Sequence, residues 1–369
     1  MTFPALTFPK GMFMQRIRPA VEGGGALTFP KGMFMQRIRP AVEGVGMTPP
    51  QLVEAGQVCL VTAGCVGRLF RLAPSKNALK IMDKCLAAAC DKFAGKIKMH
   101  AYKFMSNHYH LVLTDVDGVL PKFMGWLNSL LARSLNALRG TTGKNFEVYS
   151  KQIIEADDAE RILEAMVYTL TNGCAAHLVE RAVEWEGISS IHMRFGEPRT
   201  VDKPKLGLWA GKQAHLDRGK SARSGRSRYA RTKIAEQSTI VLHRPSAFDH
   251  LTDEEFTSRL TVRIRRTEEM WIAIRKHFGI RVAGWQKVAQ RHFNEMPRAG
   301  RELFDRQPEV AASTPERRER LERKLALFRH AYYDALRRDI DEDPKVVYPY
   351  GTWLMVQRYK KRCEPRPDS

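Results

Sequence analysis

The sequence predicts an α+β fold in which an antiparallel sheet has helices packed on one face and a mainly helical C-terminal region follows. Two observations support this prediction. Between residues 57 and 172 the elements follow in the order strand, helix, strand, strand, helix, strand, helix. The helical segments carry apolar residues at a spacing of three and four, so each has one side to bury. This order suits a sheet with helices packed against it.

Each element is placed by residue type and spacing. Residues 58–62, 96–105, 108–114 and 146–154 have the pattern of strands. Residues 75–93, 120–138 and 157–172 have the pattern of helices. Ser75 is a candidate N-cap for the first helix, because its hydroxyl can accept a hydrogen bond from a free backbone N–H.

Two histidines at the start of the third predicted strand are candidate metal ligands. Side chains two residues apart point to the same face of a strand, so His108 and His110 can present both imidazoles to one point. Two converging neutral imidazoles can begin a divalent-metal site. Taken alone, the pair is better explained as two histidines on a half-exposed strand face.

A tyrosine and an asparagine on the predicted 157–172 helix strengthen the metal-site hypothesis. Tyr168 and Asn172 lie four residues apart, so they share a helix face, which lies roughly opposite the apolar stripe. A tyrosine of the core would lie in the stripe, whereas this one points elsewhere, next to an amide that can offer its oxygen to a metal. The stripe consists of Ile162, Leu163, Met166, Val167 and Leu170.

These two pairs, with their surroundings, resemble the Y1 HUH transposases, and within them the REP-associated tyrosine transposases. The similarity covers roughly residues 57–190 and includes the segment 102–113, the pair Tyr168 and Asn172, and the segment 184–190. It implies a HUH, ferredoxin-like sheet related to the RNA-recognition fold. The family usually has a proline after the asparagine, where this chain has Gly173. Because glycine can also end a helix, we expect the helix to end there with a looser exit.

The resemblance implies a metal-dependent single-stranded DNA endonuclease and transposase. Tyr168 would be the nucleophile and form a 5′-phosphotyrosine, while His108, His110 and Asn172 would hold the metal. We expect Mg²⁺ or Mn²⁺ rather than Zn²⁺, because phosphate oxygens would supply further ligands. The phenol must lose its proton, and Gln152 is one candidate acceptor. The expected substrate is single-stranded DNA folded in part as a hairpin, and a monomer is preferred over a homodimer.

The composition independently favours a polyanionic partner. The net charge is +21 and the sequence pI is about 9.9, which indicates nucleic acid rather than an acidic membrane surface. No apolar run has the length of a membrane span, and no signal peptide is recognised. The six cysteines form no CxxC pair, which fits the reducing cytoplasm and indicates no zinc site.

We predict four regions. Residues 1–50 hold a tandem repeat, in which residues 5–23 recur at 26–44, and we expect it to be disordered, with Met1 or Met47 as the start. Residues 51–196 would be the catalytic domain, and residues 197–245 would be a basic loop. Residues 246–369 would be a helical region with DNA binding as one role. Its helices at 252–278 and 284–293 would form either a DNA-reading pair or an ordinary packed pair. The candidate DNA contacts are Arg133, Lys212, Arg223, Arg226, Arg228 and Arg231.

Three functions remain open from the sequence. The first is an active tyrosine transposase, and the second is a catalytically inactive nucleic-acid-binding protein of the same fold. The third is a metal-dependent hydrolase that uses water, with Tyr168 only structural.

Overall fold

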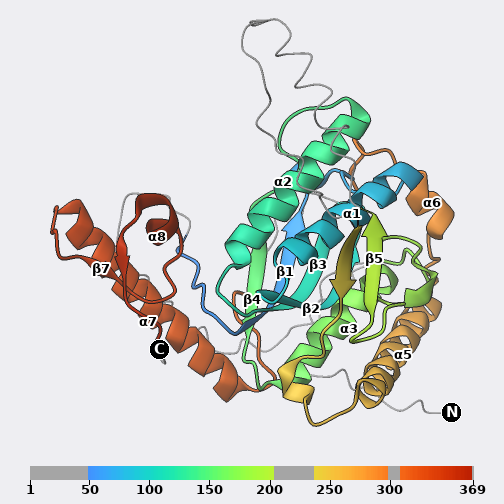
Figure 1. Ribbon diagram of the computed structural model, residues 1–369. Helices are drawn as coiled ribbons and strands as arrows, with labels where there is room; N and C mark the ends of the chain where they lie inside the picture. The colour runs from blue at the N-terminus through green and yellow to red at the C-terminus, as the bar shows by residue number, and fades with distance from the viewer. Residues whose placement is uncertain (1–48, 203–236, 298–307, 368–369) are drawn as a thin grey trace, which may run out of the picture. The chain divides into compact units, whose positions relative to one another are not determined.

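A four-stranded antiparallel sheet forms the centre of the protein in the computed structural model (Figure 1). The structure describes residues 49–202, 237–297 and 308–367, and residues from Pro50 onward belong to one unit. Almost all of the predicted N-terminal region and the basic residues Lys212, Arg223, Arg226, Arg228 and Arg231 lie outside the described residues.

The strands of the sheet are β1 (Gln57–Gly64), β2 (Ile97–Phe104), β3 (His108–Asp115) and β4 (Ser150–Ile154). Their order is β2-β3-β1-β4, and every neighbouring pair is antiparallel. This confirms the predicted antiparallel sheet. A short 3-10 helix, η1 (Val66–Arg68), follows β1.

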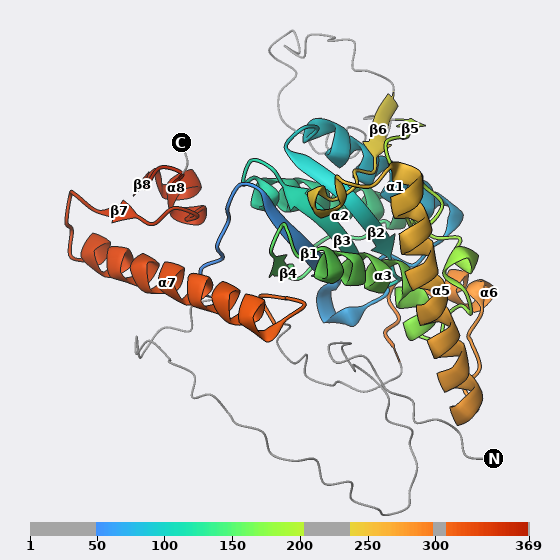
Figure 2. The same cartoon turned by 90° about the horizontal axis from the view of Figure 1, so that it is seen from below.

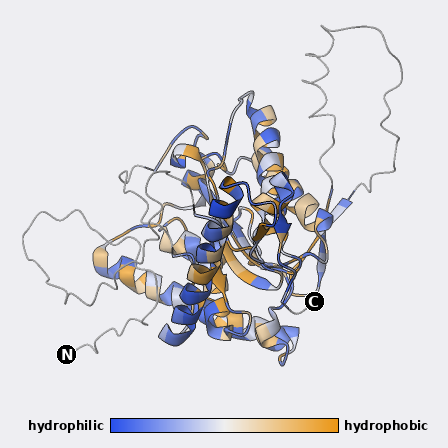
Figure 3. Ribbon diagram, turned by 90° about the vertical axis from the view of Figure 1, so that its left-hand side faces the viewer, coloured by the Kyte–Doolittle hydropathy of each residue, from blue (hydrophilic) through white to orange (hydrophobic). Residues whose placement is uncertain are grey.

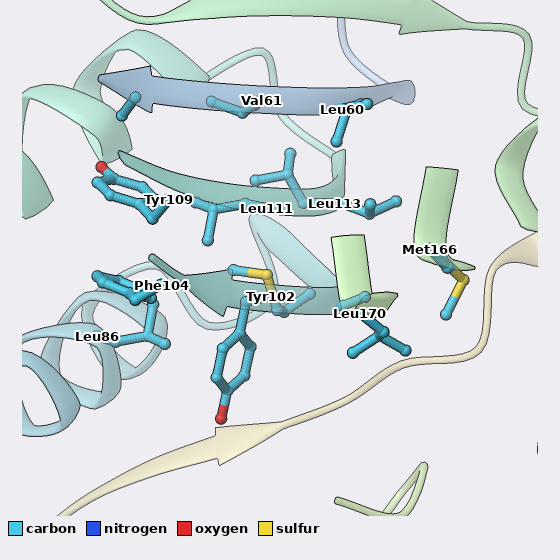
Figure 4. Packing of buried hydrophobic residues seen from close by; sticks show 14 of the residues in the cluster. Leu60, Val61, Leu86, Tyr102, Phe104, Tyr109, Leu111, Leu113, Met166 and Leu170 are labelled. Carbon is cyan, nitrogen blue, oxygen red and sulfur yellow. The ribbon is translucent and has the colours of Figure 1, made fainter. Parts of the chain in front are cut away.

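Helices α1 (Lys76–Lys92) and α2 (Leu120–Arg139) pack on one face of the sheet. Tyr109 of β3 lies on this face, because its hydroxyl donates to Oδ1 of Asn128 in α2 and its ring stacks on Phe104 at 4.6 Å. Figure 4 shows Tyr109 beside Phe104 within the core. Ser75 caps α1 by accepting from the N–H of Ala78, as predicted.

Helix α3 (Ala159–Ala175) packs on the opposite face of the sheet. This follows from β3, where successive side chains alternate: Tyr109 points to α2, and His110 points to α3. The prediction of helices on one face therefore holds for α1 and α2, while α3 forms a second layer. The helix also continues through Gly173 and ends at Ala175, so the expectation that it ends at Gly173 was wrong.

After η2 (Ala182–Glu184), the ends of the predicted 197–245 loop form a hairpin-like pair of strands. Strand β5 (Pro198–Asp202) pairs with β6 (Gln237–Val241) in antiparallel fashion, and β6 lies against α1. The short η3 (Ser246–Phe248) follows, and Phe248 is buried in the same core as α1. The apolar core therefore continues past residue 246, where the sequence predicts that the helical C-terminal region begins.

Helix α5 (Asp253–Phe278) lies beside α3 (Figure 2). It begins at a capping box of Thr252 and Glu255 and ends at Gly279 in the left-handed conformation, as its sequence predicts. Helix α6 (Trp285–Ala289) has only five residues, so the second helix predicted for 284–293 is shorter than expected. Five residues make fewer than two helical turns.

The remaining C-terminal elements are α7 (Pro315–Ile340), β7 (Val347–Tyr348), α8 (Leu354–Tyr359) and β8 (Arg362–Cys363). Helix α7 contributes a second apolar cluster that reaches the sheet at Ile153 of β4. The buried residues of α7 include Leu321, Leu325, Phe328 and Tyr332, which recur at a spacing of three or four. Figure 3 shows that the helices carry both hydrophilic and hydrophobic residues.

Both edges of the sheet are covered by other parts of the chain. At the β2 edge, Phe104 N–H donates to Ile188 O and Ser190 N–H donates to Tyr102 O. At the β4 edge, Ile153 N–H donates to Glu309 O and Ala311 N–H donates to Ile153 O. In the described residues, no helix is both long and apolar enough to span a membrane.

Candidate functional site

Strand β3 presents His108 and His110 on the face that α3 covers. Their ring centroids lie 4.8 Å apart, and His110 is buried whereas His108 is half-buried. The strand register places Thr62 of β1 on one side of His110 and Lys103 of β2 on the other. Directly paired residues of antiparallel strands point to the same face, so these four side chains belong to one polar group under α3.

Hydrogen bonds fix how each imidazole is turned. His108 Nδ1 lies 2.7 Å from Oδ1 of Asn107, an oxygen that can only accept, so the ring proton lies on Nδ1 and Nε2 keeps its lone pair. His110 Nε2 lies 3.3 Å from the amide nitrogen of Asn172, and its Nδ1 lies 2.9 Å from Oγ1 of Thr62. The amide donates to Nε2, so Nδ1–H of His110 donates to the Thr62 hydroxyl.

Helix α3 brings Tyr168 and Asn172 to the same point. The ring of Tyr168 lies 5.2 Å from the ring of His110, measured between centroids. Tyr168 is 36% exposed, whereas Asn172 is 8% exposed, so the phenol is open to a substrate and the amide lies beneath it. The structure therefore brings together Tyr168, His108, His110 and Asn172, the four residues that the sequence pairs by spacing.

The donor atoms around His110 fit a divalent cation. Burial first, and then the neighbouring groups His108 and Lys103, hold the pKa of His110 well below its ordinary value of 6.5, so its ring is neutral at pH 7. Each ligating imidazole in a metal site donates its other N–H to an oxygen, as Thr62 and Asn107 allow here. The third ligand would be the amide oxygen of Asn172, since its O and N exchange places on a half-turn of the amide. In the described residues, no group of three or more His, Cys, Asp or Glu side chains could hold a metal.

Lys103 is a further charged residue of the site that the sequence reading missed. Its ammonium is buried and donates to the carbonyl of Leu170 in α3 at 2.8 Å, and it lies 5.0 Å from the centre of the Trp185 ring. Burial lowers the pKa of Lys103 from 10.5 to about 8, against the raising effects of Cys174 and Glu268. The amine thus ties β2 to the middle of α3, between Tyr168 and Asn172 in sequence.

Gly173 permits this close packing. A Cβ at this position would lie 3.1 Å from Cγ2 of Val179, 3.2 Å from Nζ of Lys103 and 3.3 Å from Cε3 of Trp185. All three distances are shorter than ordinary contacts of a Cβ atom, so the glycine lets α3 approach the lysine and the tryptophan.

Of the other predicted residues in the described part of the chain, Arg133 lies away from His110, whereas Gln152 lies on the same face of the sheet, paired with Leu60 of β1. Arg133 is exposed on α2, which packs on the face of the sheet opposite to His110, so the structure does not bring it to the site. Gln152 of β4 is buried, and its side-chain oxygen lies 3.5 Å from the guanidinium of Arg161, at the start of α3. Arg161 is two helical turns before Tyr168.

Comparisons with known proteins give similarity at low identity. No protein-family model and no curated protein sequence matches the chain. One similar solved structure is a REP-associated tyrosine transposase bound to a REP hairpin, with a TM-score of 0.34 and 11% identity over 40% of this chain and 83% of that one. Another is tRNA(His) guanylyltransferase from Saccharomyces cerevisiae, with a TM-score of 0.27 and 11% identity over 37% of this chain and 66% of that one. At these identities and TM-scores, neither similarity identifies the chemistry of this chain. That chemistry has to be inferred from the residues around His110.

Proposed function

We propose that this protein is a metal-dependent nuclease and transposase that cleaves and rejoins single-stranded DNA through Tyr168. The observation that supports the proposal is the meeting of two pairs around one point. His108 and His110 come from a strand, and Tyr168 and Asn172 come from a later helix. A half-exposed phenol lies against a buried imidazole that shares a hydrogen bond with an amide, which is the arrangement that the proposed chemistry needs.

Tyr168 would act as the nucleophile. Its phenolic oxygen forms a bond to a DNA phosphorus, the bond from phosphorus to the 3′-oxygen breaks, and the 3′-oxygen takes up a proton while the phenol loses one. The product is a 5′-phosphotyrosine and a free 3′-hydroxyl. Because the phosphoester bond is kept, attack by another 3′-hydroxyl reverses the step and rejoins DNA without an external energy source.

The histidines and the amide would hold Mg²⁺ or Mn²⁺, which supplies Lewis-acid polarisation of the phosphate when bound. Thr62 and Asn107 keep both Nε2 atoms free of protons by accepting the Nδ1 hydrogens. The hydrogen bond from Lys103 to the carbonyl of Leu170 would hold α3 at a set distance from the sheet. In this way Lys103 would position Tyr168 and Asn172 relative to His110. It acts through the helix and is a positioning residue.

The charge of the chain supports a nucleic-acid substrate. A net charge of +21 favours binding to a phosphate backbone and makes such binding depend on salt. The half-exposed position of Tyr168 suits a strand that can reach the phenol with its backbone, which a flexible single strand does more readily than a duplex. A hairpin-containing single strand is therefore the substrate to test.

The test is a covalent adduct. The protein is incubated with Mn²⁺ and a labelled single-stranded DNA that contains a hairpin, and the mixture is separated on a denaturing gel. We expect a slowly migrating labelled protein with the wild type, and none with Tyr168→Phe. Tyr359→Phe, in an exposed tyrosine of α8, is the matched control and should form the adduct normally.

The other functions give different results in the same assay. DNA that is bound but never cut by the wild type would indicate a catalytically inactive binding protein. Cleavage that persists in Tyr168→Phe would indicate a hydrolase that uses water, and would refute the role proposed for the phenol.

A further inference from the structure

A second group of basic and aromatic side chains lies at the end of the sheet where His108 is found. We call Arg71, Arg139 and Phe293 the arginine–phenylalanine cluster; Phe70 and Arg291 flank it. The members come from the segment after β1, the C-terminal end of α2 and the segment after α6. Three distant parts of the sequence thus meet at one surface.

The two arginines of the cluster share one aromatic ring. The guanidinium carbon of Arg139 lies 4.6 Å from the centre of the Phe293 ring, and that of Arg71 lies 5.8 Å from it. Arg139 also donates to the backbone oxygen of Arg71 at 2.6 Å, and Arg71 donates to Oδ1 of Asn294 at 2.7 Å. The guanidinium of Arg291 lies 6.0 Å from the ring of Phe70. Arg291 is paired with the carboxylate of Glu295 at 3.6 Å, whereas the contacts of Arg71 and Arg139 hold their planar groups in place without neutralising them.

The charge of the cluster is not balanced by acids. Within the described residues, the ion pairs include neither Arg71 nor Arg139, and the buried Nε of Arg71 has no hydrogen-bond partner. Burial first, and then the neighbouring Arg71, lower the pKa of Arg139 from 12.5 to about 10. Two guanidinium groups held together without a carboxylate repel each other, and an anion between them would relieve the repulsion.

The cluster adjoins the histidine turn through the backbone. Cys65 N–H donates to Asn107 O at 2.8 Å, and Leu72 N–H donates to Ser106 O at 2.8 Å. The segment that carries Arg71 is therefore attached at both ends to the turn whose Asn107 orients His108. A strand bound at His108 would pass near this surface.

We propose that the arginine–phenylalanine cluster binds a backbone phosphate of the DNA single strand that enters the site at His108, with a neighbouring base packed against Phe70 or Phe293. Arginine presents a planar fork that matches a phosphate, and the half-buried rings of Phe70 and Phe293 offer aromatic surface on which a base can stack without regard to sequence. The inference rests on the proposed function for its ligand, but it concerns binding only.

The test measures binding separately from cleavage. The probe is a fluorescent oligo(dT) of about 20 nucleotides, which forms no hairpin, and affinity is followed by anisotropy over a range of salt concentrations. Arg71→Gln and Arg139→Gln are each made in the Tyr168→Phe background, so that no cutting interferes. Arg323→Gln is the matched control, since it removes one charge from an exposed position of α7.

We expect each cluster variant to bind roughly tenfold more weakly, as for the loss of a charge-assisted hydrogen bond. The slope of log affinity against log salt should fall by about 0.7 for each phosphate contact that is lost from a single strand. Arg139→Lys keeps the charge and should keep most of the slope. Circular dichroism checks that each variant is folded. If Arg139→Gln does not fold, Arg139→Lys and Arg71→Gln still test binding at this surface.

The outcomes separate this inference from the proposed function. Cluster variants that bind oligo(dT) like Arg323→Gln, with an unchanged salt slope, overturn the inference even if the wild type forms the tyrosine adduct. Cluster variants that lose affinity and slope support it even if no adduct ever forms, in which case the proposed catalysis is refuted and the binding surface stands.

Discussion

Replacement of Lys103 by methionine tests whether a buried ammonium lies between the sheet and α3. The pKa of Lys103 falls from 10.5 to about 8 because burial disfavours its charge. At pH 7 the folded protein therefore holds a cation at a cost of about 3 kcal/mol. Methionine removes that cost, but the carbonyl of Leu170, which keeps its hydrogen bond within α3, loses the additional bond from the ammonium, which costs about 1–3 kcal/mol.

The difference between the two proteins should depend on pH in a defined direction. Between about pH 8 and pH 10.5 the unfolded wild type binds more protons at this lysine than the folded protein does, so its stability rises with pH relative to the variant. From these two pKa values, the gain between pH 7 and pH 10 is about 2–3 kcal/mol. Methionine cannot titrate, and therefore Lys103→Met lacks this gain.

The assay is urea unfolding of the wild type and Lys103→Met at pH 7, 9 and 10, followed by circular dichroism. Only the difference in the free energy of unfolding between the two proteins is used. Tyrosines and cysteines titrate in the same pH range, and their contributions cancel in this difference. A difference that stays constant over this pH range would show that the ammonium is exposed to water, and would refute the packing described for α3.

Three further predictions follow from other contacts. Thr62→Val removes the acceptor of His110 Nδ1–H, and we expect about 10–100-fold weaker Mn²⁺ affinity by calorimetry, with Thr62→Ser close to the wild type. His100 lies in β2, where burial lowers its pKa from 6.5 to about 4, so its contribution to stability is present above pH 6.5 and is lost as the pH falls towards 4. The wild type should lose about 2 kcal/mol more than His100→Gln between pH 7 and pH 4.5 in urea unfolding, and equal losses would contradict this. Gly173→Ala gains about 1 kcal/mol of helix propensity but overpacks three neighbours at about 1–3 kcal/mol, so urea unfolding should show a net loss of about 1 kcal/mol, and a more stable variant would contradict the tight packing.

Elements with strong local signals could be predicted from the sequence. The helix predicted at 252–278 is α5 (Asp253–Phe278), because Thr252 and Glu255 form the capping box that they suggest and Gly279 ends the helix. Strand β4 is shorter than the predicted 146–154, since it begins at Ser150 and Phe146 forms only an isolated bridge with Cys65. The pairing that decides this boundary involves distant residues, which a local pattern does not contain.

Gly173 shows a different kind of error. Glycine commonly ends helices, and the sequence reading used that rule. Here the glycine has no positive φ and lies inside α3, where the absence of a Cβ makes room for Lys103 and Trp185. The reason for the residue is a tertiary contact, which spacing along the chain cannot reveal.

Some residues of the candidate site could be predicted from local spacing, and others could not. The pairs His108 with His110, and Tyr168 with Asn172, are visible because spacings of two and four residues place side chains on one face of a strand or a helix. Lys103 and Thr62 could not be assigned, because their place beside His110 depends on the register of β2 and β1 against β3. That register follows from the whole fold rather than from any segment.

The covered edges of the sheet restrict how copies of this protein can associate. The outer backbone groups of β2 at Tyr102 and Phe104, and those of β4 at Ile153, already exchange hydrogen bonds with segments of the same chain. A neighbouring molecule cannot add its own strand at these points unless it first displaces those segments. An assembly that leaves those segments in place would therefore form through side chains of helices and loops, with the central sheet confined to a single molecule.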